Sequence, residues 1–161
     1  MGRQKRFLSA IMLICCVTAV LIMICSIIFG KRETRAVFTP PDFDASAVAG
    51  TPDGSLIDYY GSLSGGDYQV SLSCKLKRME EGAEIWLTNP VENTVWLKAR
   101  ITDEQGNILG ETGLIRPGEY VQSVQWIIDP PAAPTVSIKI MAYEPDSYYS
   151  AGAMVLNTEI Y

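Results

Sequence analysis

A group of tyrosines and an acid near the end of the chain is the strongest candidate for molecular recognition. Tyr143, Glu144, Tyr148 and Tyr149 fall within one short stretch. Tyrosine supplies a large amphipathic contact area at a small cost in side-chain entropy. Trp96 lies on the same predicted strand face as Lys98 and Arg100. It is expected either to be covered by the stalk that precedes the domain, residues 30–66, or to be exposed for a partner. These five residues predict a surface that contacts a partner protein. The alternative is that the rings fold back over the open end of a core.

The chain lacks the side chains on which much hydrolytic and metal chemistry depends. It contains no histidine, which excludes a Ser-His-Asp or Cys-His catalytic site and any histidine-containing zinc site. No glycine-rich phosphate loop stands between a strand and a helix, and no S-x-x-K sequence occurs in the domain. We therefore expect neither an enzyme nor a cofactor-binding site.

Two groups of oxygen-bearing side chains are the types of residue that bind calcium. They are Asp42 with Asp44, and Asp103 with Glu104 and Asn107. Neither group has the D-x-[DN]-x-[DN]-G spacing with a distal glutamate that calcium loops use. We expect these to be solvated linker and turn residues, and we predict no metal site.

An apolar run without charge or proline occupies residues 7–29. As a helix it would be about 34 Å long, enough to cross a bilayer core of about 30 Å. A cleaved signal peptide is the alternative, but its apolar region usually has about 7–15 residues and ends at a small-x-small site that is not evident here. The run therefore predicts a transmembrane helix in contact with membrane lipid, an uncleaved signal anchor that follows a short basic tail at residues 1–6.

Charge is divided unevenly along the chain. Residues 1–35 hold six lysines and arginines and one glutamate, whereas residues 36–161 hold seven basic and 17 acidic residues. An acidic domain repels phosphate backbones, so we expect no nucleic-acid partner. Basic residues flank both ends of the apolar run in equal number, and the free amino terminus adds charge to the short tail. This balance favours a single-pass protein of the cell membrane with its N-terminus inside and its domain extracellular.

Cysteine usage bears on the compartment. Cys74 is the one cysteine outside the apolar run, so the domain cannot contain an internal disulfide and must depend on its apolar core. The domain also lacks an N-x-S/T glycosylation sequence. Both features favour a bacterial envelope over a secreted animal protein.

A change in the apolar period marks the predicted start of a β domain. Residues 30–66 are rich in proline, glycine and serine and predict a stalk. From Asp67 onward the period is two, which is typical of a half-buried strand. The first strand shows it in five alternate residues: Tyr68, Val70, Leu72, Cys74 and Leu76.

Further strands follow at short intervals to the end of the chain. Two turns between them have clear signals: residues 103–107, where Gly106 can adopt a positive φ, and Arg116–Glu119, with Pro117 and Gly118 at the central positions of a type II turn. About seven short strands with such turn spacing are typical of a sandwich. The predicted fold is all-β, an immunoglobulin-like antiparallel β-sandwich over residues 67–161, preceded by one transmembrane helix.

One predicted strand, residues 120–128, has an interrupted pattern. Tyr120, Val124, Trp126 and Ile128 are expected on one face, and Gln122 breaks that face. We expect Trp126 to belong to the core and the end of the face near Gln122 to be solvated.

Two short motifs allow a comparison with known domains. A D-x-x-G pattern runs from Asp103 to Gly106, and a P-G-E sequence opens a later strand at Pro117–Glu119. With these motifs the region resembles the Ig-like domains of bacterial envelope proteins, including the FxLYD-type group. The wider pattern over residues 114–120 and 141–152 is similar to uncharacterised single-pass proteins of Gram-positive bacteria. The resemblance implies a sandwich at the cell envelope, and it carries no activity and no catalytic residues.

Two functions follow from these features. The first is a non-enzymatic, membrane-anchored Ig-like module for protein binding or scaffolding at the bacterial cell envelope, for example in a surface, secretion or conjugation assembly, with an envelope protein as partner. The alternative is a ligand-binding or sensor domain for a cell-wall component or a cation, which requires an aromatic-lined concave site with convergent polar groups.

Overall fold

The alternating strands predicted from the sequence are present in the computed structural model of the chain, which describes residues 12, 16–21, 23, 38–130 and 135–161. The chain divides into two units, Met1–Phe38 and Thr39–Tyr161. The strands lie in the second unit. The elements are β1 (Val48–Ala49), η1 (Gly54–Leu56), β2 (Tyr60–Gly65), β3 (Tyr68–Ser73), β4 (Lys77–Arg78), β5 (Gly82–Asn89), β6 (Trp96–Thr102), β7 (Ile108–Glu111), β8 (Glu119–Gln125), β9 (Thr135–Tyr143) and β10 (Ser150–Glu159).

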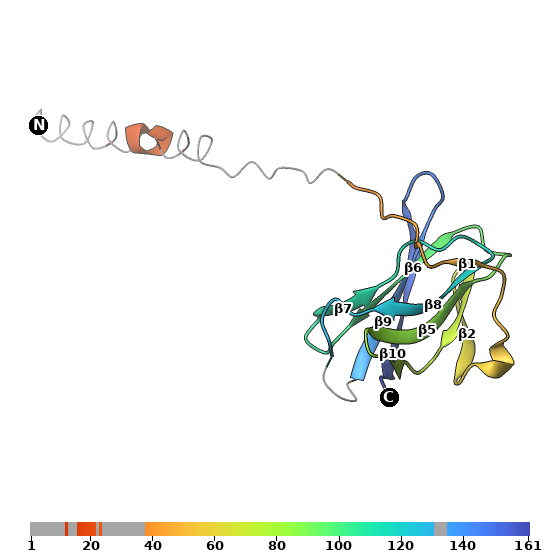
Figure 1. Cartoon of the computed structure of the whole chain (residues 1–161). Coiled ribbons are helices and arrows are strands. Elements are labelled where there is room, and N and C mark those ends of the chain that lie inside the picture. Colours follow the sequence, from red (N-terminus) through yellow and green to blue (C-terminus); the bar gives the residue numbers. More distant parts are fainter. Residues whose placement is uncertain (1–11, 13–15, 22, 24–37, 131–134) are drawn as a thin grey trace, which may run out of the picture. The chain divides into compact units, whose positions relative to one another are not determined.

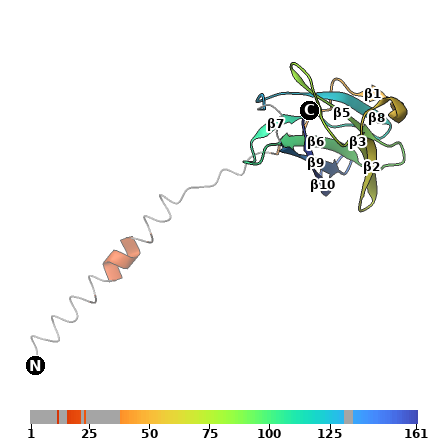
Figure 2. The same ribbon diagram turned by 90° about the horizontal axis from the view of Figure 1, so that it is seen from below.

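Two antiparallel sheets pack against each other as a sandwich (Figures 1 and 2). Among the described residues, one sheet has the order β1-β8-β5-β3-β2 with β4 also paired to β5, and the other has the order β10-β9-β6-β7. The chain passes from one sheet to the other between β5 and β6, between β7 and β8, and between β8 and β9. The prediction of a mostly β chain that forms an antiparallel sandwich is therefore confirmed.

The core lies between the two sheets and is formed by alternate residues of their strands. In β6 the side chains of Leu97, Ala99 and Ile101 are buried, while the residues between them are only half-buried. The same alternation occurs in β9. Each fully buried aliphatic side chain contributes about 1.5–3 kcal/mol relative to an exposed one. The period of two in the sequence thus identifies the inward face of these strands.

The predicted first strand is confirmed except at its end. Tyr68, Val70 and Leu72 are buried as expected, but Cys74 is only half-buried. The reason is that β3 ends at Ser73, so the alternation stops before Cys74. Leu76 is buried again because its backbone forms a separate bridge with the residue after β10.

The predicted face of β8 is wrong at two positions. Val121 and Val124 face the core, whereas Tyr120 is half-buried on the other face and Ile128 is 51% exposed. The alternation of β8 is interrupted where its register with β5 shifts, between Glu84 and Leu87, and Ile128 lies beyond the end of β8 at Gln125. Trp126 packs partly buried against the core, as the sequence predicted.

The β unit begins earlier in the chain than the predicted boundary at Asp67. The expected stalk, residues 30–66, includes β1, η1 and β2, and β2 pairs with β3 over its whole length. Glycine and serine dominate β2, so its sequence has the composition of a linker. It is a strand because it pairs with the neighbouring edge of β3. The structure therefore moves the start of the β unit to Thr39.

The predicted basic tail at residues 1–6 lies outside the described residues, as does most of the predicted transmembrane helix at residues 7–29. Met12, Cys16–Leu21 and Met23 are described, and all are helical. No helix that the described residues form has the length and apolar character needed to cross a membrane. The transmembrane helix therefore stays a prediction.

Candidate functional site

A pair of buried asparagines holds together the loops at one end of the sandwich. Asn89, the last residue of β5, donates from Nδ2 to the carbonyl oxygens of Val95 and Ile115, each at 2.9 Å. Nδ2 of Asn93 donates to Oδ1 of Asn89 and to the carbonyl oxygen of Gln69, each at 2.6 Å. Leaving a buried polar group unpaired costs about 1–3 kcal/mol, so these bonds strongly favour one loop conformation. They fix the segment that leads into β6.

A line of contacting rings lies beside this network. Trp96, the first residue of β6, contacts Phe43 edge-to-face, with ring centroids 4.8 Å apart and an angle of 77°. Tyr148 contacts Trp96 in the same manner at 5.3 Å and 62°. The guanidinium of Arg116 lies 3.6 Å from the centroid of the Phe43 ring. Edge-to-face pairs and cation–π contacts each contribute about 0.5–1.5 kcal/mol, so the line is a preorganised unit.

The last ring of this line, Tyr148, lies in the turn between β9 and β10. The amide of Tyr148 donates to the carbonyl oxygen of Glu144 at 3.0 Å, and the amide of Glu144 donates to that of Tyr149 at 2.8 Å. Asp146 and Tyr148 have φ values of 64° and 56°. Such left-handed backbone is costly for residues other than glycine, and it often occurs at functional sites. Tyr149 follows directly and is 73% exposed.

The structure brings together only part of the predicted contact set. Trp96 and Tyr148 are in ring contact, and Tyr143 is the Cα partner of Trp96 across β6 and β9. Tyr143 is half-buried, and its hydroxyl donates to the sulfur of Met141 at 3.6 Å. Glu144 and Tyr149 are exposed. Thus some of the rings cover the end of the sandwich, and Tyr149 faces solvent.

Two members of the ring line were not predicted as site residues. Phe43 belongs to the segment expected to be a stalk, and Arg116 was interpreted only as part of a turn. Phe43 reaches Trp96 because its backbone bridges Leu114 in the segment between β7 and β8. No local pattern in the sequence signals that contact. We call Phe43, Trp96, Arg116, Tyr148 and Tyr149 together the loop-end surface.

Comparison with known proteins adds no assignment to this geometry. The chain matches no protein-family model, and neither a curated protein nor a solved structure is significantly similar to it.

A network of three charges lies on the outer face of the four-stranded sheet. Nζ of Lys98 donates to Oε1 of Glu111 at 2.8 Å, and Nε of Arg100 donates to its Oε2 at 2.9 Å. Burial alone would raise the pKa of Glu111, but the hydrogen bonds and charges of Lys98 and Arg100 bring that pKa below its ordinary value. All three side chains are engaged with each other, so they stabilise the sheet rather than form an acid–base pair.

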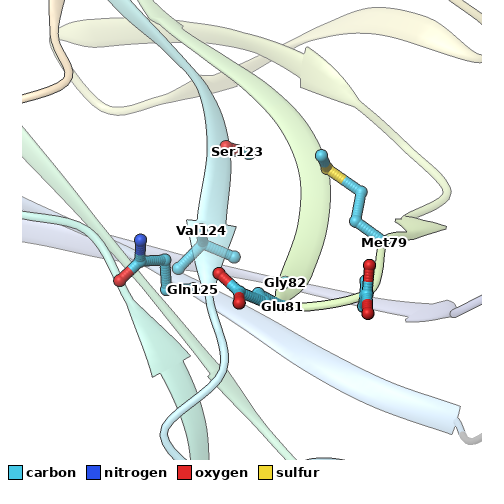
Figure 3. A pocket seen from close by; sticks show the side chains of 7 residues that line it. Met79, Glu81, Gly82, Ser123, Val124 and Gln125 are labelled. Atoms are coloured by element: carbon cyan, nitrogen blue, oxygen red, sulfur yellow. The ribbon is translucent and has the colours of Figure 1, made fainter.

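A hollow of about 300 Å³ lies at the start of β5 (Figure 3). Figure 3 shows Met79 and Glu81 from the turn before β5 on one side and Ser123, Val124 and Gln125 of β8 on the other. Gly82 allows the two strands to approach closely, because a Cβ there would clash with the carbonyl oxygen of Val124. The hollow lies beside this close approach.

The acidic residues considered for calcium act within turns. Oδ1 of Asp103 accepts hydrogen bonds from the amides of Gln105 and Asn107, and its Oδ2 accepts one from the side chain of Asn107. The bond from the Asn107 side chain is the main reason that the pKa of Asp103 is lowered. Oδ1 of Asp44 accepts from the amide of Ser46 at 2.9 Å within a turn, and its Oδ2 also accepts from the amide of the distant Gly113 at 2.7 Å. Within the part of the chain that the structure describes, no group of three or more His, Cys, Asp or Glu side chains could hold a metal ion.

Proposed function

We propose that this protein is a membrane-anchored Ig-like module that binds another protein at the bacterial cell envelope through its loop-end surface. One observation carries the proposal: a tryptophan, two tyrosines and an arginine gather at one end of a rigid sandwich, and Tyr149 is 73% exposed there. Tryptophan, tyrosine and arginine are the residue types that contribute most to binding energy in protein interfaces.

The strand order supports the Ig-like part of the proposal. β3, β5 and β8 are adjacent in one sheet, and β10, β9, β6 and β7 are adjacent in the other. The sandwich packs a six-stranded sheet against a four-stranded one, and within it these strands, with the crossings noted above, follow an arrangement that Ig-like domains use. Loops at the ends of such sandwiches commonly carry recognition residues, because the sheets hold them rigidly.

The apolar N-terminal run supports the anchored part of the proposal. The described helical residues of that run expose large apolar side chains: Met12, Val17, Val20, Leu21 and Met23. An isolated helix with apolar residues on all sides is stable in lipid rather than in water. The β unit begins at Thr39, soon after the predicted span ends at residue 29. We therefore expect the partner to lie close to the membrane.

A site-specific crosslinking experiment tests the binding surface. A photoreactive amino acid replaces Tyr149 in the full chain, expressed in the cells that naturally produce it. The control replaces Val155, which is 61% exposed but lies on β10, away from the turn that carries Tyr149. We expect a discrete crosslinked protein from position 149 and not from position 155. An identical crosslinking pattern at both positions, or none at 149, contradicts the proposal.

Two further variants of the chain test the anchor. In one, residues 7–29 are replaced by an unrelated transmembrane helix, and in the other they are deleted. Anchoring by local concentration predicts that the replacement retains the Tyr149 crosslink and that the deletion loses it. Protease treatment of intact cells, followed by immunoblotting, reports whether the β unit is outside. A full crosslink from the deleted form contradicts anchoring but leaves the binding surface intact.

A further inference from the structure

A separate groove lies on the outer side of the six-stranded sheet, between the η1 segment and the start of β5. Its volume is about 230 Å³. The residues that matter for its chemistry are Leu56, Asp58, Lys77, Glu84, Trp86 and Tyr161. We call this set the Trp86 groove. It shares no residue with the loop-end surface.

Two aromatic rings of the groove are held in place by neighbouring rings. Trp86 stacks on Tyr120 of β8, with centroids 6.0 Å apart and an angle of 21°. Tyr161 contacts Tyr59 edge-to-face at 5.9 Å, and its amide donates to the carbonyl oxygen of Leu76 at 3.0 Å. The fixed rings give the groove preformed aromatic walls within a lining that is otherwise mostly polar.

The backbone at Trp86 is unusual for a strand. Its φ is 47°, within the left-handed region, and it lies in the bulge of β5. For a bulky residue this conformation costs about 1–2 kcal/mol. The bulge changes the direction in which the side chain projects, and the indole then lines the groove. Strain of this kind, stored at a ring that borders a hollow, is a reason to consider a binding role.

Polar groups surround the two rings. The carboxylate of Asp58 has no hydrogen-bond or ion-pair partner among the described residues, and Oε2 of Glu84 lies 4.0 Å from Nζ of Lys77. Burial, followed by the charges of Asp58, Tyr59 and Glu84, raises the pKa of Tyr161. Its hydroxyl therefore stays protonated at neutral pH. The groove thus offers hydrogen-bond donors on Lys77 and Tyr161 and acceptors on both carboxylates.

We propose that the Trp86 groove binds one ring of a neutral, hydroxylated ligand, a sugar residue, which stacks on Trp86 and hydrogen-bonds to Asp58, Glu84 and Lys77. The volume fits this class, because pockets for drug-sized ligands have about 300–1,000 Å³ and a smaller groove takes a single ring. The C–H face of a pyranose is apolar and packs on an indole, while its hydroxyls need donors and acceptors at the edge.

Two ammonium groups at the groove favour a sugar over an organic cation. Lys77 lines the groove with Asp58 and Glu84, and Lys75, which is paired with Glu159, lies beside it. Nζ of Lys75 lies 5.1 Å from the centroid of the Tyr59 ring and 3.8 Å from Glu159. A cationic ligand would thus be repelled by the ammonium groups of Lys77 and Lys75. The ammonium group of Lys75 also already occupies the cation–π position on the Tyr59 ring. This site goes beyond the proposed protein-binding function, and its success or failure leaves that function unaffected.

Saturation-transfer NMR on the full chain tests the proposal. The protein is kept in a detergent that has no sugar headgroup, so that the detergent cannot occupy the groove. The probes are glucose, N-acetylglucosamine and their soluble trimers, with choline as the cationic comparison. We expect saturation transfer to at least one sugar and none to choline.

Paired variants place the binding in the groove. Trp86→Ala and Asp58→Asn each weaken sugar binding by about tenfold or more, and the matched controls Trp126→Phe and Asp67→Asn leave it unchanged. Asp58 is exposed and its carboxylate has no partner among the residues that the structure describes, so Asp58→Asn retains the fold, as circular dichroism can verify, even if Trp86→Ala does not. Absence of binding to all four sugars, undiminished binding by Asp58→Asn, or binding of choline alone overturns the proposal.

Discussion

The loop-end surface and the Trp86 groove use similar side chains in opposite arrangements. At the loop end, Trp96 contacts both Phe43 and Tyr148, so the three rings form one continuous line. In the groove, Trp86 and Tyr161 each contact a different neighbour and border a space of about 230 Å³. Rings that pack together present a solid surface suited to another protein, whereas rings that stand apart can enclose a small molecule.

The two regions also differ in what holds them. Buried side-chain amides hold the loop end, through the network of Asn89 and Asn93. The groove depends on a bulged strand with a strained Trp86. The hydrogen-bonded asparagines stabilise the fold. The strained backbone at Trp86 destabilises it, and the rest of the fold must offset that cost. This difference gives the two regions opposite responses to substitution.

The largest expected effect comes from Asn89→Leu. The substitution leaves the carbonyl oxygens of Val95 and Ile115 without their side-chain donor in a buried environment, so we expect a loss of about 3 kcal/mol in unfolding free energy. Urea unfolding of the full chain, followed by circular dichroism, measures it. Asn157→Ala is the control, because Asn157 is exposed and bonds only to Ser137, and it should cost less than about 0.5 kcal/mol. Equal effects at both positions would contradict the structural role of Asn89.

Substitutions of Trp96 and Tyr149 distinguish a residue that stabilises the loop-end surface from one that contacts the partner protein. Trp96→Ala removes two ring contacts and should cost about 2 kcal/mol of unfolding free energy. Tyr149→Ala should cost less than about 0.5 kcal/mol, because the ring is mostly in solvent. For the crosslinking measurement on this variant, the photoreactive amino acid is placed at the exposed Val91 instead. The Tyr149→Ala change should reduce the yield of the crosslinked partner protein. A stable Trp96→Ala variant would show that the ring line does not hold the surface together.

Backbone strain at Trp86 is measurable with a pair of substitutions. Trp86→Gly and Trp86→Ala both remove the indole, but only glycine adopts a φ of 47° without strain. The glycine variant should therefore be more stable than the alanine variant by about 1 kcal/mol. At Trp126, whose φ is not positive, the order should reverse. The same order at both positions would remove the evidence for strain in the groove.

The smallest expected effect is the acid response of Glu111. Its pKa is lowered in the folded state, so its contribution to stability is present above the ordinary pKa and is lost as the pH falls through the lowered value. Glu111→Gln should cost about 0.5–1 kcal/mol at neutral pH, because the ion pairs are partly exposed. The difference from the unmodified chain should vanish in acid. A constant difference for Glu111→Gln at every pH would contradict the ion-pair explanation.

Turn chemistry was the most reliable part of the sequence analysis. Gly118 has a φ of 78°, and the amide of Glu119 donates to the carbonyl oxygen of Arg116 at 3.1 Å, as the type II turn requires. The predicted hairpin loop at residues 103–107 is also present, with Gly106 at a φ of 85°. Both turns depend only on residues that are adjacent in the chain, so they can be predicted directly from the sequence.

Where pairing decides the structure, the sequence analysis was less successful. β2 has the composition of a linker and is a strand only because it pairs with β3. Val121 faces the core and Tyr120 lies beside Trp86 where the register of β5 and β8 shifts, and Gln122 signalled an interrupted pattern but not this arrangement. Of the loop-end surface, the sequence indicated Trp96, Tyr148 and Tyr149 through their residue types, but it could not indicate Phe43 or Arg116.

The sequence by itself determined the alternation that builds the sandwich, the positions of its tight turns and the absence of histidine chemistry. These follow from side-chain type and short-range backbone geometry, which do not depend on distant residues. Only the tertiary structure decided which rings meet, because Phe43 reaches Trp96 and Tyr161 reaches the groove across long separations in the chain. Strand register and bulges determine which rings come into contact. Register depends on how two strands pair, so neither strand's sequence alone specifies it.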